Sequence, residues 1–344
     1  MEELTERQKL ILTLIIHEYA RTATPVGSKG LVDQYRLEMS SATVRNEMAS
    51  LTERGYLRQP HTSAGRVPTE EGYRFFVGRL LHQTDLPDST QRMISHQFYQ
   101  TRRDVEQWMR LAASVLAHQS HAASMITAPH PERARVKHIE LISTRGRQVL
   151  IVVVMVGGEI HQRLVTLSEP VSQAQLSATA DRINQLCQGK DFEDVYSSRS
   201  TLPSLEQDVI SWVKEEIEHK DTLAAGEIYL DGIANIMSQP EFSGTEDGRR
   251  TLRILEERSL LQNVLTRTLM HSSFGGVEVL IGGEGTWEEL RQCAIVLSRY
   301  GVPGLASGTL GVLGPMRMSY GRTISTVRFM SSLLSDLVSE TLVE

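Results

Sequence analysis

Arg45 and Asn46 are the two neighbouring side chains of this sequence best suited to reading the edges of nucleic-acid bases. A guanidinium can donate two hydrogen bonds to guanine, and a carboxamide can exchange two with adenine in the major groove. Ala42 and Ala49 stand on the same side of the helix expected here. A solvated helix usually carries several Lys and Glu at such positions, so this face favours close approach to a groove.

Periodicity predicts the helix that would position these two residues. Val44, Met48 and Leu51 recur at i, i+4 and i+7, which places them on one apolar stripe facing away from Arg45 and Asn46. Ser40 and Ser41 are good N-cap residues, and Gly55 is a natural terminator after Arg54. The helix is therefore expected to begin at the serines and to end before Gly55.

A β-hairpin is expected directly after this helix. Residues 56–59 read as a short strand, 60–65 as the turn and 66–68 as the returning edge. Polar side chains cluster at the hairpin, and they could contact the nucleic-acid backbone or the minor groove: Arg58, His61, Thr62, Ser63 and Arg66.

Upstream, Thr5 and Gln8 form a capping-box pattern that opens a first helix. After Pro25 and Gly27, Ser28 can cap a short second helix. Three helices followed by a hairpin predict a winged helix-turn-helix over residues 1–82, with Thr69 capping one more helix over 70–81. The alternative is a helical bundle of purely structural role. The buried faces are expected to contain Ile11, Leu12, Ile15, Ile16 and Tyr19, then Leu31, Val32 and Tyr35, and finally Tyr73, Phe76, Val77 and Leu80.

Charge supports nucleic-acid binding only weakly. The chain has a net charge of −6, and residues 1–82 contain 11 Lys and Arg against 10 Asp and Glu. Only residues 39–66 are locally basic. Because the electrostatic attraction to DNA grows with the number of cationic contacts, two copies acting together are expected.

The run from Ser40 to Arg74, SSATVRNEMASLTERGYLRQPHTSAGRVPTEEGYR, resembles the hallmark of the bacterial heat-inducible transcription repressor family HrcA, and so does PVGSKGL at 25–31. The resemblance implies a homodimer that binds an inverted-repeat operator (CIRCE) in double-stranded DNA, prevents transcription of the chaperone operons groE and dnaK, and is released on heat shock. It also implies that the chaperonin GroEL modulates activity. Since a two-fold dimer matches an inverted repeat, we expect the following residues in the major groove: Ser40, Ser41, Thr43, Arg45, Asn46 and Ala49.

Residues 83–127 are expected to form a helical linker. His118 and His121 on it could bind a metal if a third ligand joined them, but none is close in sequence. Neither a metal nor a cofactor is therefore expected. The inward-facing set is expected to be Met93, Phe98, Val105, Trp108, Leu111, Val115 and Leu116.

The remainder reads as an α/β region whose sheet is interrupted. Strand patterns cover 137–143, 148–156 and 159–167, with a Gly157-Gly158 hairpin signal, and they return at 277–281 and 293–297. The apolar run LIVVVMV predicts a central strand buried on both faces. Amphipathic helices are expected between these regions, over 176–186, 205–217 and 252–265. Their apolar stripe, which includes Trp212, is also typical of an ordinary core face.

The resemblance implies a GAF-like sensor domain over 128–170 and 271–344, with a mainly helical dimerisation domain inserted at 171–270. The chain as a whole is thus expected to be an α+β multidomain protein. The notable glycines at 301, 304, 308, 311 and 314 are expected to form turns between short strands.

Other classes of function find little support. The glycine-rich stretch 281–285 lacks the Gly-Lys-Ser/Thr of a phosphate loop, and no catalytic motif is evident, so an enzyme is not expected. Cys187 and Cys293 have no partner spacing and are expected to be buried free thiols. No apolar run approaches ~18 residues, so a cytoplasmic protein that does not bind membranes is expected. The remaining alternatives are a ligand-gated winged-helix metabolic regulator and a structural protein or enzyme with an incidental helical bundle.

Overall fold

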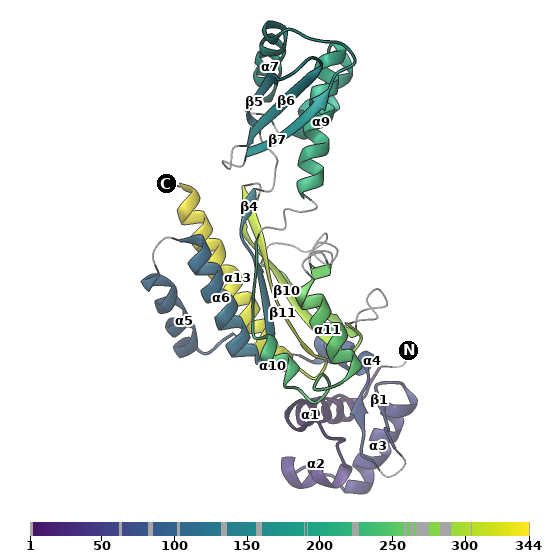
Figure 1. The fold of residues 1–344 in the computed structure, drawn as a ribbon. Helices are drawn as coiled ribbons and strands as arrows, with labels where there is room; N and C mark the ends of the chain where they lie inside the picture. Colours follow the sequence, from purple (N-terminus) through teal and green to yellow (C-terminus); the bar gives the residue numbers. More distant parts are fainter. Residues whose placement is uncertain are drawn as a thin grey trace. The chain divides into compact units, whose positions relative to one another are not determined.

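The computed structural model describes residues 3–61, 64–81, 85–101, 104–131, 136–155, 160–188, 190, 192–221, 227–257, 260–261, 265, 275–282, 290–303 and 305–343. The chain divides into two compact units (Figure 1). The first unit contains Met1–Ala128, Ile228–Tyr300 and Thr309–Glu344, and the second contains Pro129–Glu227 and Gly301–Gly308. Both contain helices and strands, so the expected α+β class is confirmed.

The first unit begins with an N-terminal module, residues 3–81, in which three helices precede a two-stranded antiparallel sheet. A capping box between Thr5 and Gln8 starts the first helix, as predicted. The elements of the N-terminal module are α1 (Glu6–Thr22), α2 (Ser28–Tyr35), α3 (Ser41–Glu53), β1 (Leu57–Arg58), β2 (Val67–Pro68), α4 (Glu70–Phe75) and the π-helical η1 (Phe76–Leu80).

Burial of the apolar stripes holds this module together. Most of the side chains predicted to face inward on α1 and α3 are at most 3% exposed, and they pack the two helices together. Burying each such side chain contributes about 1.5 to 3 kcal/mol of hydrophobic free energy. These residues are Ile11, Leu12, Ile15, Ile16, Val44, Met48 and Leu51. Tyr19, Val32, Tyr35, Val77 and Leu80, which were also expected inside, are half-buried.

Two local predictions in the module are wrong. Ser28 does not cap α2, because Gly27 occupies the N-cap position and Ser28 is the first helical residue. The first hairpin strand does not begin at Tyr56, because the Tyr56 amide bonds back to the Leu51 carbonyl at 3.0 Å while the Gly55 amide bonds to Thr52. This pair of bonds closes α3 with Gly55 at a φ of +83°.

The expected helical linker is only partly helical. Helices α5 (Asp88–Gln100) and α6 (Val105–Ser120) are present, but Ala123–Thr127 forms strand β3, which the prediction missed. His121 at a φ of +52° ends α6 and turns the chain into that strand. Met93 was predicted to face inward but is 49% exposed, since Ile94 occupies the buried position. Phe98, Trp108, Val115 and Leu116 are buried as expected, whereas Val105 and Leu111 are half-buried.

An antiparallel sheet forms the centre of the first unit, in the order β8-β3-β11-β10-β9. Strand β4 pairs with the first residues of β11, Ala306 and Ser307, which belong with it to the second unit. On β10, Ser298 bonds Ser331 of α13, whereas its neighbour Leu297 packs toward Ile254 of α11, so the two helices cover opposite faces (Figure 1). The bounds are β8 (Ile228–Asp231), β4 (His130–Pro131), β11 (Ala306–Pro315), β10 (Cys293–Val302), β9 (Val277–Ile281), α10 (Ile233–Met237), α11 (Glu246–Glu256) and α13 (Tyr320–Val343).

The second unit contains a separate sheet, in the order β5-β6-β7, with helices against one of its faces. Side chains of β6 alternate between buried and half-buried, so this central strand is not buried on both faces as predicted. The bounds are β5 (Val136–Ser143), β6 (Gln148–Met155), β7 (Ile160–Thr166), α7 (Gln173–Cys187), α8 (Phe192–Ser197), the 3-10 turn η2 (Arg199–Thr201) and α9 (Ser204–Asp221).

The topology corrects the expected partition of the chain. Strands β5, β6 and β7 were assigned to the same sheet as residues 277–297, yet they pair only with each other among the described strands. Strand β8, at 228–231, was expected in a helical insertion but pairs with β3. The third expected helix, 252–265, is divided: α11 begins at Glu246 and ends at Glu256, residues 260–261 and 265 are helical again, and positions 258–259 and 262–264 lie outside the described residues. The glycine-rich 301–314 region contains the end of β10 and most of the long strand β11 rather than several short strands, and the Gly157-Gly158 hairpin lies outside the described residues.

Candidate nucleic-acid interface

Helix α3 presents a polar face opposite its buried stripe. Val44, Met48 and Leu51 point into the module, which leaves Arg45 and Asn46 exposed. Neither side chain forms a hydrogen bond or ion pair with another described residue, so both retain their full hydrogen-bonding capacity. Ala42 is exposed, and Ala49, predicted to face outward, is half-buried.

The beginning of α3 is held by its own side chains. Ser40 is the N-cap, and its hydroxyl accepts a hydrogen bond from the Thr43 amide at 3.1 Å. The two hydroxyls also lie 2.9 Å apart. Ser41 is half-buried in the first turn. Ser40 and Thr43 therefore have a structural role, whereas any contact that they make with DNA remains a prediction.

The hairpin is fixed to the helices by backbone and side-chain hydrogen bonds. Val26 and Arg66 form an isolated antiparallel bridge, with N–O distances of 2.9 and 2.8 Å. The Arg66 Nε donates to the hydroxyl of Thr52, near the end of α3, at 3.0 Å. Gly65 lies so close to the Val26 carbonyl oxygen that a Cβ there would be 2.3 Å from it. These contacts attach the described part of the hairpin to α3 and to the segment before α2.

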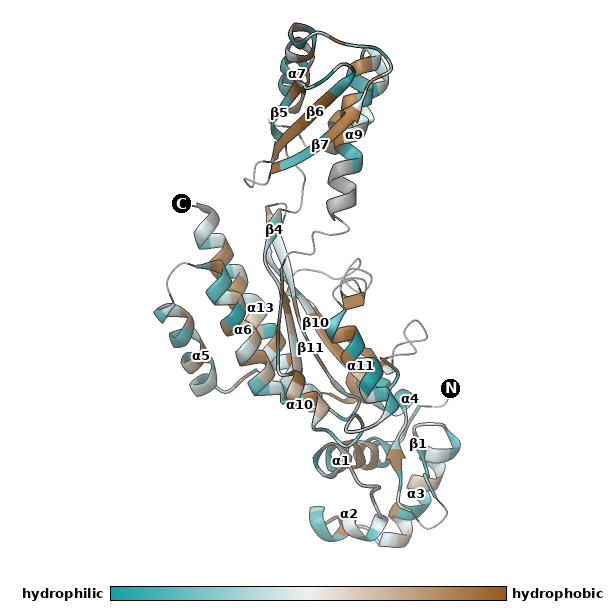
Figure 2. Cartoon of the chain, in the orientation of Figure 1, coloured by the Kyte–Doolittle hydropathy of each residue, from teal (hydrophilic) through white to brown (hydrophobic). Residues whose placement is uncertain are grey.

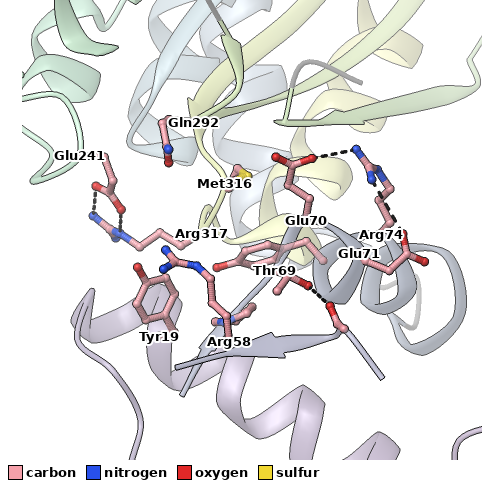
Figure 3. A pocket seen from close by; sticks show the side chains of 13 residues that line it. Tyr19, Arg58, Thr69, Glu70, Glu71, Arg74, Glu241, Gln292, Met316 and Arg317 are labelled. Carbon is pink, nitrogen blue, oxygen red and sulfur yellow. Dashed lines mark hydrogen bonds and ion pairs between the residues drawn. The ribbon is translucent and has the colours of Figure 1, made fainter. Parts of the chain in front are cut away.

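Arg58 is exposed on β1, and its backbone pairs with Val67, the neighbour of Arg66. Its side chain lines a cavity of about 560 Å³ together with Tyr19, Thr69, Glu241 and Arg317, the last two outside the N-terminal module (Figure 3). Burial is the main cause that raises the pKa of Tyr19, and the positive charges of Arg58 and Arg317 oppose it. The sequence places Arg58 and Arg66 on the same hairpin. It does not show that residues outside the N-terminal module, such as Glu241 and Arg317, line a cavity together with Arg58.

The turn of the hairpin is only partly described. His61 is exposed, and its carbonyl accepts a hydrogen bond from the Ala64 amide at 2.8 Å. Thr62 and Ser63, both predicted to contact DNA, lie outside the described residues.

Ion pairs reduce the negative charge near α3. Glu47 on α3 pairs with Arg7 on α1 at 3.4 Å. Glu18 accepts hydrogen bonds from Arg21, Gln34 and Tyr35, and its pKa is lowered, mainly by the hydrogen bond from Arg21. Arg45 is exposed and pairs with no described residue, whereas Glu47 on the same helix is paired with Arg7, and this arrangement favours an anionic ligand at the surface of α3.

Other expected features can also be located. His118 and His121 have ring centroids 6.2 Å apart, and the described residues contain no cluster of three metal-ligating side chains. Cys187 and Cys293 are buried free thiols, as predicted. None of the helices in the described ranges is both long and apolar enough to cross a membrane.

Comparison with known proteins identifies a family. The family model described as HrcA protein C terminal domain matches residues 106–324. A heat-inducible transcription repressor HrcA of Roseiflexus castenholzii is 44% identical over 346 aligned residues, which cover 98% of this chain and 95% of that protein. The protein of the same description from Chloroflexus aurantiacus is 42% identical over 360, covering 98% and 94%. A crystal structure of a hypothetical protein has a TM-score of 0.60 at 21% identity, covers 98% of this chain and 100% of its own, and shows a common fold.

Proposed function

The chain belongs to the HrcA family of heat-inducible transcription repressors, and on that premise we propose that it represses heat-shock genes by binding operator DNA through α3. The observation that carries the proposal is the pair Arg45 and Asn46, which are exposed, form no hydrogen bond or ion pair with another described residue, and lie on a helix whose other face is buried. Repression of transcription is not a catalytic role.

We propose that the N-terminal module is a winged helix-turn-helix. Helix α3 would enter the major groove, with Arg45 and Asn46 reading bases, while Arg66 and His61 on the hairpin would contact the backbone or minor groove. Arg58 is assigned a lesser part, because its side chain lines the cavity beside Glu241. The larger sheet with its flanking helices would be the GAF-like domain. Its residues would then be 123–127, 228–231 and 277–343 instead of the expected 128–170 and 271–344.

We also propose that the protein acts as a homodimer that binds an inverted repeat, the CIRCE element upstream of groE and dnaK. Dimerisation is assigned to the second unit, on the face of its sheet opposite α7 and α9. Ile160 and Leu164 on β7 are 64% and 55% exposed there, and Ile142 on β5 is 39% exposed. Register places Leu150 of β6 between Ile142 and Leu164, so the apolar surface is continuous, and β6 itself is strongly hydrophobic (Figure 2). Exposed apolar patches of this kind mark protein interfaces.

Release on heat shock and the influence of GroEL follow from mass action. A chaperonin that favours the folded state raises the population able to bind DNA, and heat-unfolded proteins that occupy the chaperonin lower it. Activity in the cytoplasm is part of the same proposal.

Footprinting tests the proposal directly. The purified protein should protect both half-sites of an inverted repeat from a chaperone promoter, and the Arg45→Ala, Asn46→Ala double variant should protect neither. Protection by the double variant equal to that of the wild type would reject α3 as the reading helix.

A further inference from the structure

Two arginine side chains attach the N-terminal module to the rest of the first unit. We propose that Arg317 and Arg74 are positioning residues, which set the half-site spacing that a dimer accepts without contacting DNA. The inference rests on the proposed function, because spacing has meaning only for a dimer that binds two half-sites.

Arg317 lies between β11 and α13 and reaches across to α1. Its side chain is 10% exposed and forms a two-pronged ion pair with Glu241, at 2.6 and 3.2 Å. Its Nη2 also donates to the Gln239 side chain at 2.7 Å, and its Nη1 donates to the Ala20 carbonyl at 3.1 Å. Ala20 is in the last turn of α1, where carbonyl groups lack helical partners and a cation is favoured. One guanidinium therefore connects the end of α1 to the segment between α10 and α11.

Arg74 connects the same two parts in the opposite direction, from the module to the rest of the first unit. It belongs to α4 of the module, and its Nη2 donates to the Ile281 carbonyl, at the end of β9, at 3.0 Å. The same guanidinium pairs with Glu70 at 3.2 Å. The carboxyl of Glu70 packs so closely on Gly282 that a Cβ there would meet it at 2.4 Å. Figure 3 shows the Arg317 and Arg74 contacts on two sides of the cavity.

A buried aromatic contact accompanies these two hydrogen-bonded sites. Tyr73, next to Arg74 on α4, packs its ring 5.9 Å from that of Tyr320, at the start of α13. The exposed fractions of the two side chains are 1% and 2%. Because these contacts lie at separate points, on α1 and on α4, they resist rotation of the module against the rest of the first unit as well as separation from it.

Orientation matters because the second half-site is bound within the same complex. Its effective concentration is greatest when the two modules match the span of the operator, and it falls when they do not. In a dimer that holds its two first units in a fixed relation, a rigidly attached module gives a sharp preference for one spacing. A loosely attached module gives weaker binding to the best operator and tolerates other spacings.

Arg317→Met tests this, since methionine keeps an unbranched apolar stem but donates no hydrogen bond. Affinity would be measured by fluorescence anisotropy on a duplex with one half-site and on inverted repeats lengthened or shortened in single-base-pair steps. The wild-type protein is expected to bind the best spacing about tenfold more tightly than the flanking spacings. In the variant this ratio of affinities should fall to about twofold, whereas the affinity for the duplex with one half-site should not change. Arg74→Met should act in the same direction, and Arg317→Lys should recover little because an ammonium cannot reproduce the fork.

Controls separate the possible failures. Arg253→Met removes an exposed arginine of α11 whose ion pair within the described residues is with Glu257, and it should retain the wild-type spacing profile. A wild-type spacing preference that survives in Arg317→Met and Arg74→Met overturns the inference. Equal losses on one half-site and on the full repeat overturn it as well, because they indicate general damage. Failure of the wild-type protein to bind either duplex rejects the proposed function itself.

Discussion

The guanidinium of Arg66 and the hydroxyl of Thr52 are joined by a 3.0 Å hydrogen bond that links the hairpin to the last turn of α3. Only the Nε is used by this bond, so the outer nitrogens of Arg66 can still face a phosphate. The bond therefore holds the Arg66 side chain in one direction relative to α3, which suits the phosphate contact that we propose for it.

Arg66→Ala should weaken binding to operator and scrambled duplexes alike. The lost phosphate contact should reduce the slope of log K against log salt by about 1. Anisotropy titrations across salt would measure this. Thr52→Val keeps the shape of residue 52 and the Arg66 charge, so it should cause a smaller loss with an unchanged slope. A full slope in Arg66→Ala would argue against the phosphate contact.

Asn46→Ala should reduce discrimination instead. If Asn46 makes a two-pronged base contact, the preference for operator over scrambled DNA should fall by about 1 to 3 kcal/mol. Because Asn46 is exposed and forms no hydrogen bond with described residues, stability should change little. Competition titrations on both duplexes and a urea melt would check both parts. A uniform loss on the two duplexes would assign Asn46 a backbone contact.

Gly65→Ala should destabilise the module by about 1 to 3 kcal/mol, because its Cβ would overlap the Val26 carbonyl at 2.3 Å. Gly30→Ala is the matched control. Gly30 lies inside α2 with nothing within 4 Å of a Cβ, so alanine there should stabilise by about 0.5 to 1 kcal/mol. Urea unfolding monitored by circular dichroism would give both values. Equal stability of the two variants would contradict the close approach.

Leu164→Arg should convert the proposed dimer to a monomer, since it places a charge on the apolar face of the β5-β6-β7 sheet. Met93→Arg is the control, because Met93 is also about half exposed but lies on α5. Sedimentation velocity would measure the oligomeric state. A Leu164→Arg dimer of wild-type strength would place the interface elsewhere.

Both cysteines should resist thiol reagents in the folded protein. Burial raises the pKa of Cys187 to about 11 and that of Cys293 to about 12, which suppresses the reactive thiolate near neutral pH. Stopped-flow reaction with a disulfide reagent should thus follow unfolding. Cys187 lies in the second unit and Cys293 in the first, so each single variant, Cys187→Ser or Cys293→Ser, keeps one thiol in one unit. Comparing the labelling of the two variants on heating would show which unit unfolds first. Fast labelling at low temperature would show that the thiols are accessible.

Local signals in the sequence predicted the module well because they act over a few residues. The Thr5 capping box, the Val44 stripe and the Gly55 terminator all depend on neighbours within one or two turns. Sheet membership was predicted poorly, since β3 and β8 pair across 100 residues of intervening chain and short apolar segments do not specify partners. The contact between Arg317 and Ala20 could not be foreseen for the same reason. An isolated arginine carries no periodicity, and only the fold brings it to the end of α1.

Reading of an operator by α3 is tested most directly by fluorescence anisotropy. The purified protein would be titrated on an inverted-repeat duplex from a chaperone promoter and on a scrambled duplex, both across salt. We expect salt-dependent binding to both duplexes, with a clear preference for the repeat that Asn46→Ala reduces. Equal affinity of the folded wild-type protein for the two duplexes would contradict it.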